Sequence, residues 1–232
     1  MQVRLIKSFH FEAAHWNPVG GEKQRRLHGH SYRVDILVTG NVESPCGWLL
    51  DFAEIRTAFD PCRHMLDHAF LNELPGMGNA RLPDVRQWIL NRLIGVLPGT
   101  VDVQVGIVGD CAFLPRRLAA DSRLALPERI RFSFEAAQEL PQLPEGHPCR
   151  RLHGHSYRVE VGGTDMATLE PLLKKLYETL DHRHLNEIKG LEHATSERLS
   201  EWIWKWLVGS GVTPTVVVVQ ETETARCVYY GE

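Results

Sequence analysis

Three histidines near the start of the chain have the spacing of a metal site. His28 and His30 are two residues apart, and residues 31–39 after them alternate between apolar and polar as a strand does. Both imidazoles should therefore project from one face. His15 follows another alternating segment, residues 2–13, and we expect it beside them. Neutral imidazoles on adjacent strands form a tripod with one open coordination position, which is typical of a catalytic zinc.

The segment that carries two of these histidines occurs twice. Arg-Arg-Leu-His-Gly-His-Ser-Tyr-Arg-Val fills residues 25–34 and again residues 150–159. Phe-x-Phe-Glu-Ala-Ala precedes each copy, and Leu-Asp-His follows each. The second copy keeps His153 and His155 but has Gln138 in place of the third histidine. Because glutamine is a poor zinc ligand, we expect that site to bind metal weakly or not at all.

The repeat predicts two similar units rather than one large domain. They occupy residues 1–114 and 130–232, and a connector rich in proline and arginine spans residues 115–129. Each unit runs through two strands, two helices and a further strand, which favours an α+β fold with an antiparallel sheet and two helices on one face. Edge-to-edge joining of the two sheets would protect exposed strand edges.

The expected elements after the first two strands follow the periodicity of the apolar residues. Helices are expected to begin at Asp51, with Phe52 on the buried face, and at Asp84. The other expected helices cover residues 169–180 and 196–207, and the other expected strands cover residues 101–108, 131–137, 156–161 and 215–220.

Composition excludes several classes of function. A formal net charge of −3 gives no long-range attraction to nucleic acid. The sequence shows neither a leader nor a bilayer-spanning stretch, so we expect no membrane partner. Five scattered cysteines, among them Cys46 and Cys149, do not suit a disulfide framework and favour a reducing, cytoplasmic setting. Units this small commonly pack against neighbours, so we expect a homo-oligomer.

The motifs resemble the 6-pyruvoyl-tetrahydropterin synthase and 6-carboxytetrahydropterin synthase family. They are Phe-x-Ala-Ala-His, Cys-x-x-Leu-His-Gly-His, Gly-x-x-x-Asp-Phe, Leu-Asp-His-x-x-Leu-Asn, Thr-Ser-Glu and a late Glu-Thr. The resemblance covers nearly the whole chain as two family units in tandem. It implies the tunnelling fold, assembly of units into a β-barrel, and active sites where units meet.

The resemblance also implies roles for individual residues. Zn²⁺ would be held by His15, His28 and His30, and a carboxylate of the last strand would grip the pterin ring by paired hydrogen bonds. The cysteine that serves the family as a base is Gln24 in the first unit. Residues matching the catalytic and substrate-binding positions are Asp67, His68, Cys149, Asp181, His182, Thr195, Ser196, Glu221 and Thr222.

Each unit has lost different parts of this set. The first unit has no carboxylate near Ile107, where the anchor belongs, whereas the second unit has Glu221 but an incomplete tripod. We therefore expect the tripod of the first unit to face Glu221 of the second, and the opposite pocket to be inactive. Glutamine cannot accept a proton at neutral pH, so Gln24 is not the catalytic base. The candidates for that base are Glu22, Cys149 and the Asp-His pairs.

The function implied is that of a zinc-dependent pterin lyase. It resembles 6-carboxytetrahydropterin synthase of the queuosine-type pathway and would act on the small molecule 7,8-dihydroneopterin triphosphate. The alternatives are a non-catalytic pterin- or purine-binding protein and a tunnelling-fold enzyme with altered pterin chemistry. For the assembly, an alternating four-unit barrel from two chains and a pseudo-hexamer from three chains both remain open.

Overall fold

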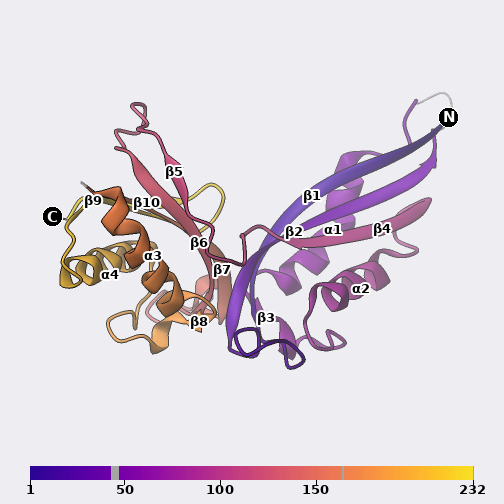
Figure 1. Ribbon diagram of the computed structural model, residues 1–232. Coiled ribbons are helices and arrows are strands. Elements are labelled where there is room, and N and C mark those ends of the chain that lie inside the picture. Colours follow the sequence, from indigo (N-terminus) through magenta and orange to yellow (C-terminus); the bar gives the residue numbers. More distant parts are fainter. Residues whose placement is uncertain (43–46, 164, 232) are drawn as a thin grey trace.

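The computed structural model describes residues 1–42, 47–163 and 165–231, so Cys46 lies outside the described residues. The chain forms two units that share the order of two long strands, a helix, a two-residue strand, a short 3₁₀ helix, a second helix and a further strand (Figure 1). The first contains β1 (Gln2–His15), β2 (His28–Asn41), α1 (Phe52–Leu66), β3 (Ala69–Phe70), η1 (Leu71–Glu73), α2 (Leu82–Leu93) and β4 (Thr100–Ile107). The second contains β6 (Arg129–Gln138), η2 (Pro148–Arg150), β7 (His153–Gly163), α3 (Met166–Leu180), β8 (Arg183–His184), η3 (Leu185–Glu187), α4 (Ser196–Gly209), β9 (Pro214–Gln220) and β10 (Arg226–Tyr229).

Each unit is a sheet covered by its two helices, which confirms the predicted α+β class. The first sheet has the order β3-β1-β2-β4, and the second has the order β10-β9-β7-β6-β5, with β8 beside β6. The long strands pair antiparallel, whereas the two-residue strands β3 and β8 pair parallel with β1 and β6. The connector is not wholly irregular, because it contributes β5 (Arg116–Leu118) to the second sheet.

Apolar helix faces close one core in each unit. Ile55 and Phe59 of α1 and Ile89 of α2 are fully buried against the first sheet. The second core is built in the same way from α3, α4 and the strands of the second sheet. Phe52 departs from the expectation, because as the first residue of its helix it remains 47% exposed.

The second helix begins two residues earlier than its sequence indicates. Asp84, expected at the start, occupies the third helical position of α2, and its carboxylate accepts a hydrogen bond from the backbone N–H of Arg81. Pro83 fits the first turn because a helix leaves the N–H groups there without internal partners. The acidic residue therefore caps the helix from inside its first turn.

The two units meet where the paired strands β1–β2 and β6–β7 approach each other, and their sheets diverge away from that contact (Figure 1). Gly29 of β2 lies against Gly154 of β7 so closely that a Cβ on Gly29 would stand 2.3 Å from the Cα of Gly154. On either side, the backbone N–H of Ser31 donates to Oγ of Ser156, and the N–H of Ser156 donates to Oγ of Ser31, both at 3.1 Å. The junction is thus nearly symmetric.

The expectation of edge-to-edge joining is not met within one chain. Over the described residues the two sheets stay separate and cross at the glycine pair instead of sharing a ladder. Within residues 1–42, 47–163 and 165–231, no helix combines the length and apolar character that a bilayer span requires.

Candidate metal centre and active site

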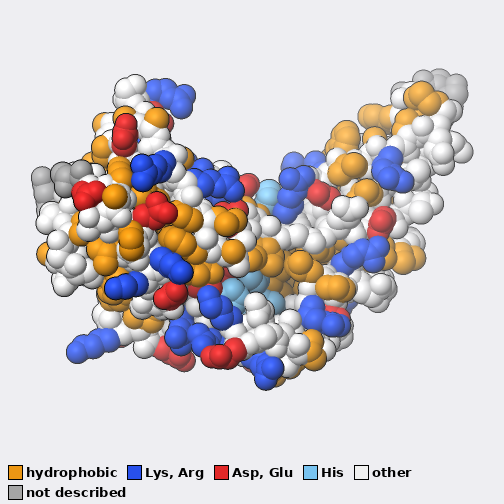
Figure 2. All heavy atoms as spheres, viewed as in Figure 1, with side chains coloured by type: hydrophobic (Ala, Val, Ile, Leu, Met, Phe, Trp, Pro, Cys, Tyr) orange, Lys and Arg blue, Asp and Glu red, His pale blue; other side chains and the backbone are white. Residues whose placement is uncertain are grey.

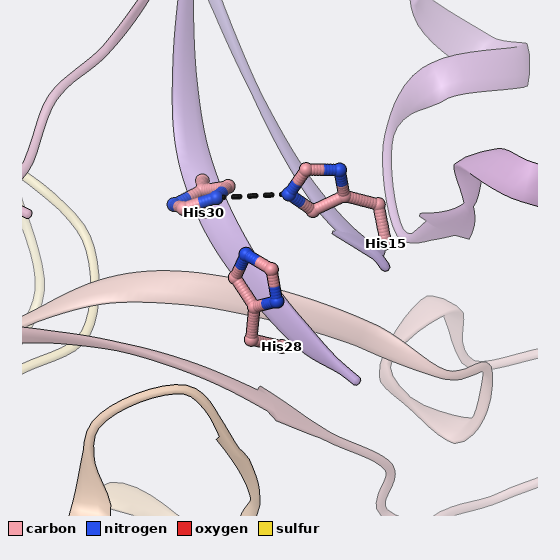
Figure 3. Close-up of side chains that lie close together, drawn as sticks. All are labelled: His15, His28 and His30. Atoms are coloured by element: carbon pink, nitrogen blue, oxygen red, sulfur yellow. Dashed lines mark hydrogen bonds between the residues drawn. The ribbon is translucent and has the colours of Figure 1, made fainter. Parts of the chain in front are cut away.

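The tripod histidines come together at the end of the first hairpin. His15 is the last residue of β1 and pairs in register with His28, while Ala13 pairs with His30. Residues two apart on a strand share a face, so the pairing places all three imidazoles on one side of the hairpin (Figure 3). Each is buried, and one nitrogen from each lies within 4.8 Å of the others.

Hydrogen bonds fix these rings for metal binding. Nδ1 of His15 lies 2.8 Å from the carbonyl oxygen of Ala80, and Nδ1 of His28 lies 2.8 Å from that of Arg26. A carbonyl only accepts, so Nδ1 carries the proton in both rings and the lone pair is on Nε2. Nε2 of His15 lies 3.0 Å from Nε2 of His30. Two lone pairs repel at this distance, so a proton or a cation between the two nitrogens would stabilise the contact.

Burial keeps the tripod neutral. It is the largest cause that lowers the pKa of His15 and of His30, each to about 3, and it also lowers the pKa of His28. Metal ligation requires the neutral imidazole, so the site is ready to bind at neutral pH. The donor set fits Zn²⁺, because three imidazoles leave a fourth position for a substrate oxygen.

Carboxylates of the opposite unit support the metal-site histidines. Glu135 of the second unit accepts from Nδ1 of His30 at 2.7 Å. Its counterpart in the first unit, Glu12, accepts from Nδ1 of His155 at 2.9 Å. Neither glutamate was predicted from the sequence, although the repeat held the signal, because each copy keeps a glutamate at the same place in its Phe-x-Phe-Glu-Ala-Ala segment.

The Asp-His pair of the second unit faces the tripod of the first. The ring of His182 packs on that of His28 with centroids 4.2 Å apart, and Nδ1 of His182 lies 2.9 Å from Oδ2 of Asp181. Lys23 donates to the same oxygen at 2.9 Å. Burial would raise the pKa of Asp181, but His182 and Lys23 hold it at about 2. Lys23, adjacent to Gln24, is a further site residue that was not predicted from the sequence.

The other Asp-His pair makes the reciprocal contact with the second unit. The ring of His68 packs on that of His153 with centroids 4.5 Å apart, and Nδ1 of His68 lies 3.2 Å from Oδ1 of Asp67. Sγ of Cys149 lies 3.5 Å from Nε2 of His68. Burial would lower the pKa of His68, but Asp67 and Cys149 raise it to about 9. The thiol of Cys149, the imidazole of His68 and the carboxylate of Asp67 therefore lie next to one another in that order.

Backbone strain marks both pairs. His68 and His182 each have φ of 54°, in the left-handed region that non-glycine residues rarely occupy. Their backbone N–H groups donate at 2.6 Å to the carbonyl oxygens of Glu12 and Glu135. Strain of this kind persists where the surroundings determine it, and it clusters at functional sites.

Glu221, which we expect opposite a tripod, does not lie there within one chain. Glu221 lies beside the histidines of its own unit: Oε1 is 2.6 Å from Nε2 of Gln138 and 3.2 Å from Nε2 of His155, and Oε2 accepts from Ser196 at 2.9 Å. Burial alone lowers the pKa of His155, yet Glu12 and Glu221 raise it to about 10. Within one chain Glu221 therefore belongs to the second pocket and not to the tripod.

The remaining predicted residues take varied places. Thr195 caps α4, where its hydroxyl accepts from the N–H of Arg198 at 3.4 Å, and Thr222 is half-buried after β9. Gln24 is exposed. The side chain of Glu22 is 88% exposed and pairs with Arg26, so this carboxylate lies in solvent rather than against the tripod.

Two clusters of side chains result, which we call the two pockets, and each uses both units. One contains the tripod of the first unit with Asp181, His182 and Lys23, and the other contains Cys149, His153, His155 and Glu221 with Asp67 and His68. Histidine side chains gather where the units meet (Figure 2). The pattern is that of a tandem α+β protein with candidate metal-binding groups at the junction between its units.

Similarity to known proteins identifies the family to which the chain belongs. A sequence profile described as 6-pyruvoyl tetrahydropterin synthase matches residues 4–105 and 129–232, so the chain belongs to this family, as two units in tandem. The 6-carboxy-5,6,7,8-tetrahydropterin synthase of Synechocystis sp. is 41% identical over 119 residues, covering 43% of this chain and 88% of that protein. The dihydroneopterin monophosphate aldolase of Pyrococcus furiosus is 32% identical over 104 residues, covering 45% and 86%.

One solved structure illustrates the same coverage. The 6-pyruvoyl tetrahydropterin synthase of Caenorhabditis elegans is 16% identical, with a TM-score of 0.38, and the match covers 46% of this chain and 96% of that one. The two curated relatives each match less than half of the chain and most of their own length. That coverage agrees with a chain that contains two family units.

Proposed function

We propose that the chain is a zinc-dependent pterin lyase resembling 6-carboxytetrahydropterin synthase, of the queuosine-type pathway, with 7,8-dihydroneopterin triphosphate as its substrate. Family membership and the name of the Synechocystis relative support the substrate class. The observation that carries the proposal is the neutral tripod of His15, His28 and His30 with His182 of the other unit packed on it. Such a site would combine an electrophile, the metal on the tripod, with a proton carrier, the imidazole of His182.

The chemistry divides between the metal and the chain. Zn²⁺ bound to the tripod would lower the pKa of a substrate hydroxyl and polarise a carbonyl. Asp181 lies 2.9 Å from Nδ1 of His182, so its charge would favour a proton on that nitrogen and leave Nε2 of the ring to take or give a proton. Lys23 keeps Asp181 ionised by its contact with Oδ2. These residues move a proton at His182 Nε2 without needing the cysteine that Gln24 replaces.

The second pocket holds the other predicted catalytic and binding groups. We propose that Glu221, with Ser196, Thr195 and Thr222 nearby in sequence, binds a pterin ring through its paired oxygens. Cys149, with His68 and Asp67, would exchange protons there. Because Glu221 does not reach the tripod within one chain, a single pterin held by both requires a neighbouring copy.

The assembly is part of the proposal. Among the described residues, β4 pairs only with β2, and β10 pairs only with β9, so both units present a free strand edge. Such edges are templates for pairing with another chain. A homo-oligomer of two or three chains would cover them, and light scattering coupled to gel filtration measures the number of chains.

Activity on the substrate tests the function. The purified chain is stripped of metal, reloaded with Zn²⁺ and incubated with 7,8-dihydroneopterin triphosphate, and products are followed by chromatography. Zinc-dependent turnover that His28→Ala abolishes supports the lyase. Arg56→Ala, a change in an exposed residue of α1 outside both pockets, is the matched control and should keep the rate. No turnover by the zinc-loaded chain would reject the proposal.

Gln24 favours a second candidate, a pterin-binding protein without lyase activity. No thiol lies at the family's base position in the first unit, and the glutamine there is exposed. The aldolase relative favours a related alternative, a change of pterin chemistry on the same fold. Tight pterin binding without turnover identifies the first case, and carbon–carbon cleavage of a dihydroneopterin without triphosphate loss identifies the second.

A further inference from the structure

We infer that the second unit binds a divalent cation of its own, held by Nε2 of His153, Nε2 of His155 and the carboxylate of Glu221. The sequence alone makes this site look damaged, because Gln138 stands where the first unit has His15. In the structure, a side chain just after the end of β9 fills the missing ligand position. The inference concerns metal binding and does not depend on lyase activity.

Two buried imidazoles supply the first ligands. His153 is fully buried and His155 is 2% exposed. Nδ1 of His153 donates to the carbonyl oxygen of Arg151 at 2.7 Å, and Nδ1 of His155 lies 2.9 Å from the carboxylate of Glu12. These contacts repeat those of the intact tripod and leave both Nε2 atoms without a backbone partner; Nε2 of His153 lies 3.5 Å from the amide nitrogen of Gln138. A carboxylate behind a ligating histidine is a common second layer of zinc sites.

The third ligand comes from Glu221, which in the metal-loaded chain without substrate would bind the cation instead of a pterin ring. One oxygen of this carboxylate and one nitrogen of each of His153 and His155 all lie within 4.8 Å of one another. Nε2 of His155 is 3.2 Å from Oε1 of Glu221, yet the two are not aligned as a hydrogen bond, and among the described residues this buried nitrogen has no hydrogen-bond partner. An unpartnered nitrogen facing a carboxylate at this distance is an arrangement that two ligands of one cation adopt.

Gln138 explains why the carboxylate stands there. Its amide Nε2 donates to Oε1 of Glu221 at 2.6 Å, and the hydroxyl of Ser196 donates to Oε2 at 2.9 Å. A histidine at position 138 would be a ligand itself, whereas the amide is a donor that holds the carboxylate against the imidazoles. Gln138 is therefore a positioning residue. Two histidines and a glutamate form a donor set that catalytic zinc accepts, with an open fourth position.

Two other occupants compete for the same space. A proton on His155 would form an ion pair with Glu221 and exclude the metal. His68, Cys149 and His153 also have ligand atoms within 4.8 Å of one another, so a thiolate site is the second competitor. Metal counting and ligand spectroscopy separate these from the proposed site.

Metal stoichiometry tests the inference. The metal-free chain is loaded with excess Zn²⁺, passed through gel filtration and analysed by mass spectrometry of the metal. We expect two Zn²⁺ per chain, one in His28→Ala, and none in His28→Ala combined with Glu221→Gln. Glu223→Gln in the same background is the matched control, because this nearby carboxylate is half exposed, and it should keep one Zn²⁺. Gln138→Ala in that background should weaken the remaining site about 10–100-fold.

Several results would overturn the inference. One is a His28→Ala chain that folds by circular dichroism but binds no Zn²⁺, and another is equal retention in the Glu221→Gln and Glu223→Gln chains. A thiolate charge-transfer band in the Co²⁺-loaded His28→Ala chain would assign the ligand to Cys149 instead. If the variants do not fold, diffraction from the unchanged zinc-loaded chain at the zinc edge decides: a peak between His153, His155 and Glu221 supports the site, and a peak only at the tripod rejects it.

Discussion

Replacing Gly29 with alanine should separate the units and damage both pockets together. A Cβ at this position would stand 2.3 Å from the Cα of Gly154 and 2.8 Å from the carbonyl oxygen of Ala13. Carbon atoms in contact lie about 3.5–4.0 Å apart, so the strands must open by about 1.2 Å or more. Both neighbours are backbone atoms, and no side-chain rotation relieves the overlap.

The magnitude follows from what that opening breaks. Forced overpacking of this kind costs about 1–3 kcal/mol. The reciprocal hydrogen bonds between Ser31 and Ser156, both 3.1 Å long, would exceed hydrogen-bond length. Their loss adds about 0.5–1.5 kcal/mol each. We therefore expect Gly29→Ala to lower the free energy of unfolding by about 2–6 kcal/mol in total.

The assay has two readouts and one matched control. Urea denaturation measures the free energy of unfolding, and small-angle X-ray scattering measures whether the units move apart. Gly106→Ala is the control, because Gly106 lies in β4 without a positive φ, and a Cβ added there would have nothing within 4 Å. That change should be neutral or slightly stabilising. If Gly29→Ala matches Gly106→Ala in both readouts, the close crossing of the strands is not what joins the units.

Further predictions concern the tripod pocket. Lys23→Ala should raise the pKa of Asp181 from about 2, as carbon-detected NMR titration measures; the stabilisation by this contact is present above the unfolded pKa of about 3.8 and disappears as pH falls through about 2. His182→Ala should lower zinc-dependent turnover by about 10²–10⁴-fold while the zinc content stays unchanged, and an unchanged rate would remove His182 from the proton path. Gln24→Cys should raise turnover at least about 10-fold, and no gain would show that the thiol is dispensable in this pocket.

Local pattern was enough to predict that the three tripod histidines lie together. His28 and His30 share a face because strand side chains alternate, and a hairpin brings the end of β1 beside the start of β2. The class of fold followed from the order of strands and helices. Short elements were missed: β10 contains only four residues, and β5 lies in a connector with few strand formers.

The contents of each pocket depend on packing between units, which no local pattern specifies. His182 meets His28 because the two hairpins cross at Gly29 and Gly154. Glu221 stays with His155 because β9, which ends just before Glu221, pairs with β7 in the same unit. Within one chain Glu221 does not face the tripod, so its approach to a tripod remains a prediction about contacts between neighbouring copies.

The crossing also explains why the two units can differ without either pocket losing its support. Nδ1 of His30 is hydrogen-bonded to Glu135, and Nδ1 of His155 is hydrogen-bonded to Glu12. Each set of candidate metal-site histidines is therefore held by a carboxylate of the other unit. Each set also receives its Asp-His pair from the other unit. A change confined to one copy, such as Gln24, therefore alters one pocket while the supporting residues for both remain. Separate expression of either unit would remove these supports from both sites at once.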